Sequence, residues 1–150
     1  MFPHVTVAAV GGGTINLPSD LADSYGVVLL FRGAWCPYCN AQIAAFSRAY
    51  EALAKLRVKV IALSADDEVA SSALVNKYGV RFPIGHSADV DSVAAVTGAY
   101  TSANPKYLQS TGFVLDPAGR VITAVYSSEA IGRLVPEDVA GLVRYVTSHS

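Results

Sequence analysis

The stretch VVLLFRGAWCPYCNAQI, residues 27–43, decides the fold of this chain. It opens with an apolar run, residues 27–31, that is too short for a buried helix and is flanked by Gly26 and Gly33. Such a run is typical of a strand covered on both faces, as in a parallel sheet. We therefore expect a central strand here.

A helix is expected directly after this strand. Pro37 suits the first helical position, because its missing N–H has no partner there. This places Cys36 at or next to the N-cap. The apolar residues that follow recur at spacings of three and four, which lines up one buried face of a helix. They are Ile43, Phe46, Tyr50 and Leu53.

The next segments complete a βαβ unit. Val58–Leu63 is apolar enough for a second strand, and a helix capped by Asp66 and ended by Gly79 is predicted after it. A strand, a helix and a parallel strand in this order connect with a right-handed crossover.

Two hairpins and two further helices are expected in the remainder. Residues 5–10 and Thr14–Leu17, separated by three glycines, predict an N-terminal β-hairpin. The turn DPAG, between residues 113–115 and 121–125, predicts a second hairpin. Residues 82–84 are expected as a brief extended piece, 89–97 as a helix, 101–110 as a loop, and the segment from Pro136 as the last helix.

This order of elements is similar to the layout of the thioredoxin fold. We expect an α/β protein with a central mixed sheet flanked by helices and an added N-terminal β-hairpin. The chain has 150 residues, with no internal repeat and no linker-like change of composition. A single domain over residues 1–150 is therefore predicted.

The composition excludes several classes of protein. Apolar residues make up 52% and charged residues 15%, so disorder is excluded. No stretch approaches the ~20 apolar residues of a membrane span, and a net charge of −1 gives no nucleic-acid footprint. The N-terminus lacks the positive start and apolar block of a signal peptide, so a cytoplasmic location is expected.

The sequence contains two cysteines, Cys36 and Cys39, and they indicate the chemistry of the protein. In a reducing compartment, two cysteines this close together indicate redox chemistry or metal binding. A helix N-terminus offers unpaired N–H groups and partial positive charge, which favour the thiolate form of Cys36. Cys39, three residues on, lies on the same helix face within disulfide reach. We expect Cys36 to attack first and Cys39 to resolve the product.

Two other roles are open to the pair. The cysteines can serve as small buried hydrophobic residues, although their place after a buried strand favours chemistry. A structural metal site needs about four ligands, and His4, His86 and His149 are far apart in the sequence. We therefore expect neither a metal nor a cofactor.

The segment FRGAWCPYCNAQI, residues 31–43, resembles the active-site segment of peroxiredoxin-like proteins of the alkyl hydroperoxide reductase and thiol-specific antioxidant family. GFVLDPAGRV, residues 112–121, is similar to the late hairpin of that family, and the resemblance covers most of the chain. It implies reduction of hydroperoxides at Cys36 and disulfide formation with Cys39. It also implies recycling by a dithiol protein such as thioredoxin.

The sequence departs from that family at several positions. Peroxiredoxins typically carry Pro-x-x-x-Thr/Ser-x-x-Cys, whereas Leu29 and Gly33 stand at the Pro and Thr positions here. Ser110 stands where an arginine is expected before the late strand. Because a peroxidase must polarise the O–O bond, a thiol–disulfide reductase is an alternative. A non-catalytic redox-sensing or binding module is a further one.

Five residues are expected to support the cysteines. Arg32 can stabilise the thiolate or bind peroxide, although strand alternation equally allows it to face solvent. Tyr38 lies between the cysteines, where covering them is favoured over donating a hydrogen bond. Thr111 is expected to offer a hydroxyl where thioredoxins have a cis-proline. Trp35 and Pro37 complete the set.

The expected partners are a small hydroperoxide or disulfide and a thioredoxin-like electron donor, with no nucleic acid and no membrane. A homodimer is compatible with the sequence, which does not fix the oligomeric state. Residues 127–129 and Arg133, after the late hairpin, are expected in a solvated loop rather than at the rim of the site or a subunit contact.

Overall fold

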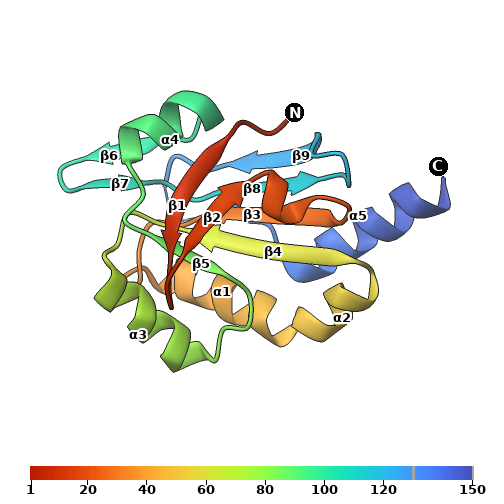
Figure 1. The fold of residues 1–150 in the computed structure, drawn as a ribbon, viewed down its shortest axis with the longest axis horizontal. Helices are drawn as coiled ribbons and strands as arrows, with labels where there is room; N and C mark the ends of the chain where they lie inside the picture. The colour runs from red at the N-terminus through yellow and green to blue at the C-terminus, as the bar shows by residue number, and fades with distance from the viewer. Residues whose placement is uncertain (130, 150) are drawn as a thin grey trace.

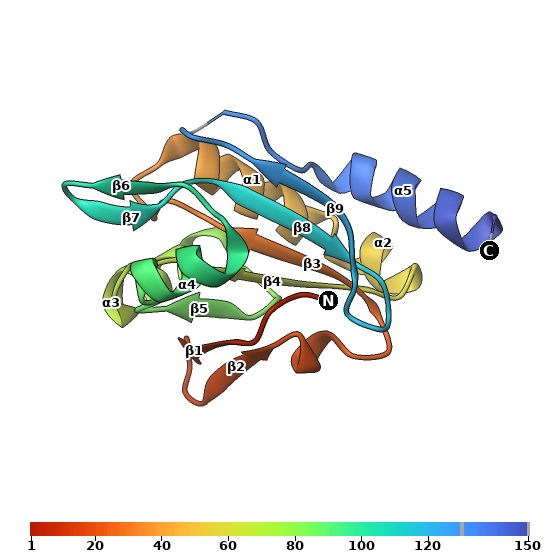
Figure 2. The same cartoon turned by 90° about the horizontal axis from the view of Figure 1, so that it is seen from above.

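Over residues 1–129 and 131–149, which this computed structural model describes, seven strands form one mixed sheet (Figure 1). Helices lie on both faces of this sheet (Figure 2). The strand order is β2 (Thr14–Leu17), β1 (Val5–Ala9), β5 (Ile84–His86), β4 (Val58–Leu63), β3 (Tyr25–Leu30), β8 (Thr111–Leu115) and β9 (Val121–Tyr126). The helices are α1 (Pro37–Arg48), α2 (Tyr50–Lys55), α3 (Glu68–Tyr78), α4 (Val90–Thr97) and α5 (Pro136–Ser148), with a short 3-10 turn at Ser19–Leu21.

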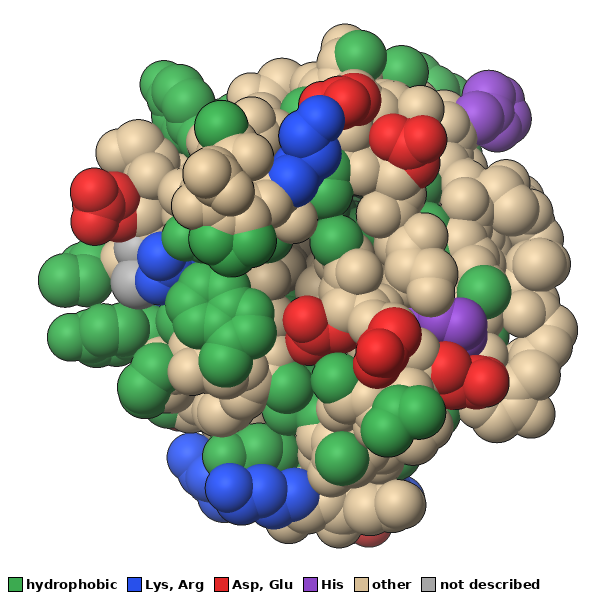
Figure 3. All heavy atoms as spheres, turned by 90° about the vertical axis from the view of Figure 1, so that its left-hand side faces the viewer, with side chains coloured by type: hydrophobic (Ala, Val, Ile, Leu, Met, Phe, Trp, Pro, Cys, Tyr) green, Lys and Arg blue, Asp and Glu red, His purple; other side chains and the backbone are tan. Residues whose placement is uncertain are grey.

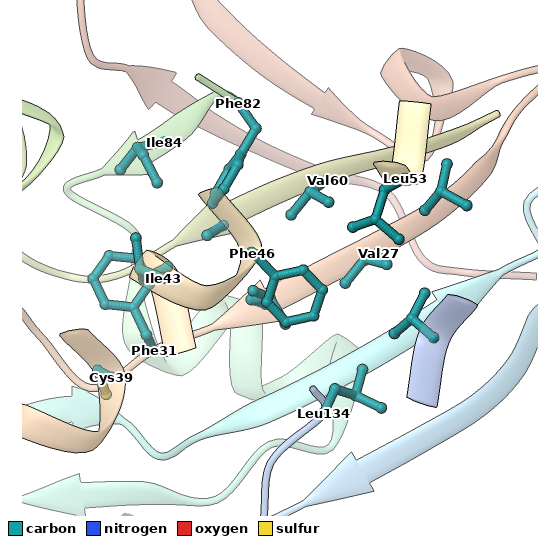
Figure 4. Close-up of a cluster of buried hydrophobic side chains, with 14 of the residues drawn as sticks. Val27, Phe31, Cys39, Ile43, Phe46, Leu53, Val60, Phe82, Ile84 and Leu134 are labelled. Atoms are coloured by element: carbon teal, nitrogen blue, oxygen red, sulfur yellow. The ribbon is translucent and has the colours of Figure 1, made fainter. Parts of the chain in front are cut away.

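β3 is covered on both faces, as the apolar run predicted. Successive side chains of a strand point to opposite faces. Val27 and Leu29 join the hydrophobic cluster that includes side chains of α1, α2, α3 and α5. Figure 4 shows part of this cluster. Val28 and Leu30 join a second cluster, which includes side chains of α4. β3 also pairs in parallel with β4, so the expected βαβ unit is confirmed.

Both predicted hairpins are confirmed. β1 and β2 pair antiparallel, and β1 also pairs with β5, so the N-terminal hairpin extends the central sheet. β8 and β9 form the late hairpin, and β8 runs antiparallel to β3. The α/β fold with a helix-flanked mixed sheet is thereby confirmed. Within the described residues, no helix is long and apolar enough to cross a membrane.

The single long helix predicted after Pro37 is wrong in one respect, because the chain forms two helices separated at Ala49. The apolar residues on both sides of the break still pack into the same cluster. The spacing of apolar residues therefore predicted the buried face correctly but not the continuity of the helix.

The predicted cap of α3 is also wrong by one residue. Asp67, not Asp66, is the N-cap, and its carboxylate accepts a hydrogen bond from Ala70 N at 2.9 Å. Asp66 instead accepts the backbone N–H of Ala34 at 2.7 Å. Either aspartate can cap a helix by type, and the tertiary contact to Ala34 decides between them.

The segment 101–110, expected as a loop, contains a small hairpin. β6 (Thr101–Ala103) and β7 (Lys106–Leu108) pair antiparallel, with Ser102 opposite Tyr107. Each strand has only three residues, which is too few for an alternating pattern to be recognised in the sequence. This hairpin projects beside the end of the sheet where β3 and β4 finish (Figures 1 and 2).

Candidate active site

The two cysteines lie where β3 ends and α1 begins. Cys36 is the N-cap of α1, and its Sγ accepts a hydrogen bond from Cys39 N at 3.4 Å. Pro37 occupies the first helical turn, so the predicted start of the helix is confirmed. Both cysteine side chains are fully buried, and Figure 4 shows Cys39 at the edge of the core, beside Phe31.

The loop that leads into the pair is held from two sides. Asp66 accepts Ala34 N, and Asn40 Nδ2 donates to Ala34 O at 2.9 Å. Gly33 is required by packing, because a Cβ there would lie 2.2 Å from Trp35 Nε1. These contacts fix the backbone that leads to Cys36.

Arg32 reaches the sulfur of Cys36 from this loop. Its Nη1 lies 3.7 Å from Cys36 Sγ, and its backbone N–H donates to Cys39 Sγ at 3.3 Å. The guanidinium packs against two aromatic rings, 5.0 Å from Trp35 and 5.2 Å from Tyr107. Its Nη2 also donates to Tyr107 Oη at 2.9 Å. The side chain is thus turned toward the cysteines rather than toward solvent.

Arg133 supplies a second guanidinium. Its Nη2 lies 3.2 Å from Cys39 Sγ and 3.8 Å from Cys36 Sγ. Its Nη1 donates to Gln42 Oε1 at 2.8 Å, while Gln42 Nε2 donates to Leu134 O at 3.0 Å. For Arg133 the expectation of a solvated loop is therefore wrong, because Gln42 ties this side chain to α1. Ser128 and Glu129, earlier in the loop, are exposed as expected.

Sequence reasoning missed this arrangement because Arg133 lies 97 positions after Cys36. One local signal was present. Gln42 is a polar residue on the otherwise apolar face of α1, three residues after Cys39, and it is buried. A buried polar side chain requires hydrogen-bond partners, and here these partners come from the distant loop.

The pKa values of the two thiols are shifted in opposite directions. Burial alone raises the pKa of the Cys36 thiol, but hydrogen bonds from Cys39 and Arg32, together with the charge of Arg133, outweigh it. The pKa of Cys36 therefore lies below its ordinary value. Burial and the neighbouring Cys36 raise the pKa of Cys39, and contacts with Arg133 and Arg32 offset this only in part. Cys36 is thus the sulfur favoured as thiolate.

The remaining predicted residues lie around this centre in different ways. Trp35 packs edge-on against Tyr107, with ring centroids 4.9 Å apart. Tyr38 is 53% exposed. Its ring therefore covers the two cysteines less than the sequence predicted. The Thr111 hydroxyl donates to Gln109 O at 3.2 Å. This hydroxyl therefore donates to a backbone carbonyl, and the supporting role expected of Thr111 stays a prediction.

Over residues 1–129 and 131–149, no group of three or more His, Cys, Asp or Glu side chains could hold a metal ion. The chemistry supported by the described residues is that of sulfur and two guanidinium groups.

A thioredoxin-type fold that places one activated cysteine at a helix N-cap, with a second cysteine in the same turn, defines a thiol-dependent oxidoreductase. The model of the AhpC/TSA family matches residues 1–124 of this chain. The chain belongs to the AhpC/TSA family.

The proteins that are similar in sequence to this chain carry two kinds of name. The thiol-disulfide oxidoreductase ResA of Bacillus anthracis is 30% identical over 146 residues, covering 97% of this chain and 76% of that protein. A peroxiredoxin of Treponema denticola is 28% identical over 151 residues, covering 98% and 72%. The chain is therefore similar both to peroxiredoxins and to a thiol–disulfide oxidoreductase.

Solved structures agree on the fold. Peroxidoxin BcpB from Mycobacterium tuberculosis has a TM-score of 0.81 at 18% identity, covering 96% of this chain and 94% of that one. The reduced 2-Cys peroxiredoxin of Plasmodium vivax has a TM-score of 0.77 at 17% identity, covering 98% and 94%. At these identities the likeness concerns the backbone fold.

Proposed function

We propose that this protein reduces hydroperoxides with Cys36 as the attacking thiolate and Cys39 as the resolving cysteine. The observation that carries the proposal is the pair of guanidinium groups, from Arg32 and Arg133, within 4 Å of Cys36 Sγ. Cationic donors at this distance stabilise a thiolate and can stabilise the negative charge that develops on a leaving oxygen.

The first step forms an S–O bond and breaks the O–O bond. The Cys36 thiolate attacks the terminal oxygen of R–O–O–H, so the sulfur is oxidised by two electrons to sulfenic acid. The other oxygen leaves as RO⁻ and becomes ROH with the proton that the Cys36 thiol lost on ionisation. Arg32 and Arg133 are placed to stabilise the charge during this transfer.

The second step forms the disulfide. Cys39 attacks the sulfenic sulfur of Cys36, an S–S bond forms, and the hydroxyl leaves as water with the proton of the Cys39 thiol. The raised pKa of Cys39 disfavours its thiolate. The Arg133 guanidinium, 3.2 Å from Cys39 Sγ, opposes this effect and assists the ionisation of the thiol. Two thiols and one hydroperoxide thus give one disulfide, one alcohol and one water.

A dithiol protein of the thioredoxin type then reduces the disulfide by thiol–disulfide exchange. The exposed rings of Trp35 and Tyr38, next to the two cysteines, offer this donor a contact surface. We place the cycle in the cytoplasm, where the thiol form is maintained between turnovers, and assign it an antioxidant role. The homodimer stays a prediction.

A second candidate function is reduction of disulfides, in which the Cys36 thiolate attacks a substrate sulfur instead. The 30% identity to a thiol-disulfide oxidoreductase favours it. So does the sequence, since Gly33 and Ser110 replace the threonine and arginine that the family resemblance leads one to expect.

One side-by-side experiment separates the two functions. The reduced protein is mixed with equimolar hydrogen peroxide or with a small aromatic disulfide, and the loss of thiols is followed by stopped flow. Loss of two thiols to peroxide far faster than free cysteine supports the peroxidase. Fast reaction with the disulfide, and a peroxide rate equal to that of free cysteine, identifies the reductase.

A further inference from the structure

A cavity of about 620 Å³ opens beside the start of β4. Because β4 runs parallel to β3, and Cys36 follows the end of β3, the cavity and the cysteine pair lie at opposite ends of the sheet (Figure 1). Figure 3 shows the cysteine end, where acidic side chains lie beside hydrophobic and basic ones. The chemistry proposed above does not use the cavity, although its volume is typical of sites that bind small molecules.

The cavity follows an edge of β4 that has no partner strand. β5 pairs with β4 only at Ala62 and Leu63, and Ala62 N donates to Pro83 O at 3.2 Å on this edge. Alternate residues of a strand bond to the same side, so the N–H groups of Val58 and Val60 face this edge too. No strand of the described residues pairs with them there, although Val58 is 5% and Val60 4% exposed. Since buried N–H groups nearly always have a partner, these two donors are available to a ligand.

Three cationic side chains line the same cavity, those of Arg57, Lys59 and Arg81. Lys59 belongs to none of the ion pairs found among the described residues. Arg57 Nη2 donates to the backbone carbonyl of Asp23 at 3.3 Å, a contact that leaves its charge unneutralised. Asp20 also lines the cavity, and its carboxylate accepts a backbone N–H at 2.8 Å. Because the whole chain has a net charge of −1, this excess of positive charge is local.

Much of the remaining lining is apolar, and its larger side chains are those of Leu21, Ile61 and Phe82. The Arg81 guanidinium is held in place, 4.4 Å from the ring centroid of Tyr50 and 3.0 Å from a carboxylate oxygen of Glu51. The cavity thus combines cationic groups, backbone donors and an apolar wall. Such a lining suits a ligand with a negatively charged head and an apolar body.

We propose that this cavity binds a small organic anion with an apolar body. Arg57, Lys59 and Arg81 attract the charged head, and the N–H groups of Val58 and Val60 donate to its oxygen atoms. Carboxylates and phosphates both accept hydrogen bonds from guanidinium and ammonium groups, so both are heads of this kind. The inference goes beyond the proposed function, because the cysteines take no part in the binding.

The test is isothermal titration calorimetry of the full chain with four probes: octanoate, octyl phosphate, n-octanol and inorganic phosphate. At least one of the two octyl anions is expected to bind about tenfold more tightly than n-octanol, which lacks the charge. The same anion should bind about tenfold more tightly than inorganic phosphate, which lacks the apolar body. The tighter of the two octyl anions identifies the head. If neither octyl anion binds, or if n-octanol or inorganic phosphate binds as tightly, the inference is overturned.

Two further measurements locate the binding. Lys59→Met should weaken it about fivefold, as for the loss of one exposed ion pair. Lys55→Met is the matched control, because it removes the same charge from an exposed lysine in the last turn of α2 that does not line the cavity. In the unmodified chain, the octyl anion should shift the amide NMR signals of Val58 and Val60.

Equal weakening in both lysine variants, or unshifted amide signals of Val58 and Val60, contradicts a site in this cavity. Reaction rates of Lys59→Met with peroxide and with disulfide should match those of the unmodified chain, which shows that the variant is folded. The proposed function is decided by those rates in the unmodified chain and does not depend on the outcome of the titration.

Discussion

Two arginines, from different regions of the molecule, contact the same pair of sulfur atoms. Arg32 precedes the pair by four residues and lies between two aromatic rings, 5.0 Å from Trp35 and 5.2 Å from Tyr107. Arg133 comes from the loop between β9 and α5 and is held by the amide of Gln42. The Arg32 guanidinium contacts Cys36 alone of the two sulfurs, whereas the Arg133 guanidinium contacts both and lies closer to Cys39.

In the proposed function, this difference assigns the two arginines to different steps of the thiol cycle. A cation beside Cys36 assists the first attack, and a cation beside both sulfurs also assists the formation of the disulfide. Because the pair shares one site, the pKa values of the two cysteines depend on each other. The two arginines should therefore be distinguishable by which step slows when each is removed.

The largest effect is expected from the cysteines themselves. Cys36→Ser should abolish reaction with both peroxide and disulfide, since it removes the attacking sulfur. Cys39→Ser should keep the first attack and accumulate a sulfenic acid or mixed disulfide on Cys36, detectable by mass spectrometry. Equal loss of the first attack in both variants would contradict the assigned order.

Removing both cations should have the next largest effect. In Arg32→Met/Arg133→Met, burial of Cys36 is no longer offset by positive charge, so the pKa of its thiol rises. A higher thiol pKa means less thiolate at neutral pH, and the alkylation rate at pH 7 should fall about fiftyfold or more, the combined loss of two charge-assisted contacts. The rate should recover at alkaline pH, which a full pH–rate profile measures. An unchanged profile would show that the hydrogen bonds from Cys39 and the helix N-terminus activate Cys36 without the arginines.

The two single arginine variants should slow different steps of the cycle. Arg32→Met is expected to slow the first attack about tenfold, and Arg133→Met should slow the conversion of sulfenic acid to disulfide by a similar factor. Rapid-quench thiol counting follows both steps separately. Replacement of each arginine by lysine keeps the charge and should restore part of the lost rate. If both single variants slow the same step equally, the two regions are not distinct.

The smallest effect is expected at Gln42. Gln42→Leu removes the hydrogen bonds to Arg133 and Leu134 but leaves both charged groups in place. We expect disulfide formation to slow two- to threefold and the free energy of unfolding to fall by about 1–2 kcal/mol, the usual cost of lost buried hydrogen bonds. Urea denaturation measures the stability.

The region around Cys36 could be predicted because its determinants are close in sequence. An apolar run, two glycines and Pro37 set the strand, the turn and the start of the helix, so the N-cap position of Cys36 followed from local rules. The reach of Arg32 toward Cys36 also lay within this segment, although alternation alone left its direction open. The wrong choice of Asp66 as a helix cap shows the limit, because only the contact with Ala34 distinguishes it from Asp67.

The other half of the site depends on contacts between segments far apart in the chain. Tyr107 lies 75 positions after Arg32. It belongs to β7, which has three residues and is too short to show a strand pattern in the sequence. Arg133 follows a strand in a loop, and its sequence context gives no sign of a partner.

By itself, the sequence determined the sheet, the reactive pair and which cysteine begins the helix, because turn chemistry and apolar periodicity act over a few neighbouring residues. Only the tertiary structure decided which charged and polar side chains surround the two sulfurs. Such contacts form when the sheet and its loops come together, and pairing across about 100 positions has no local signature in a single chain.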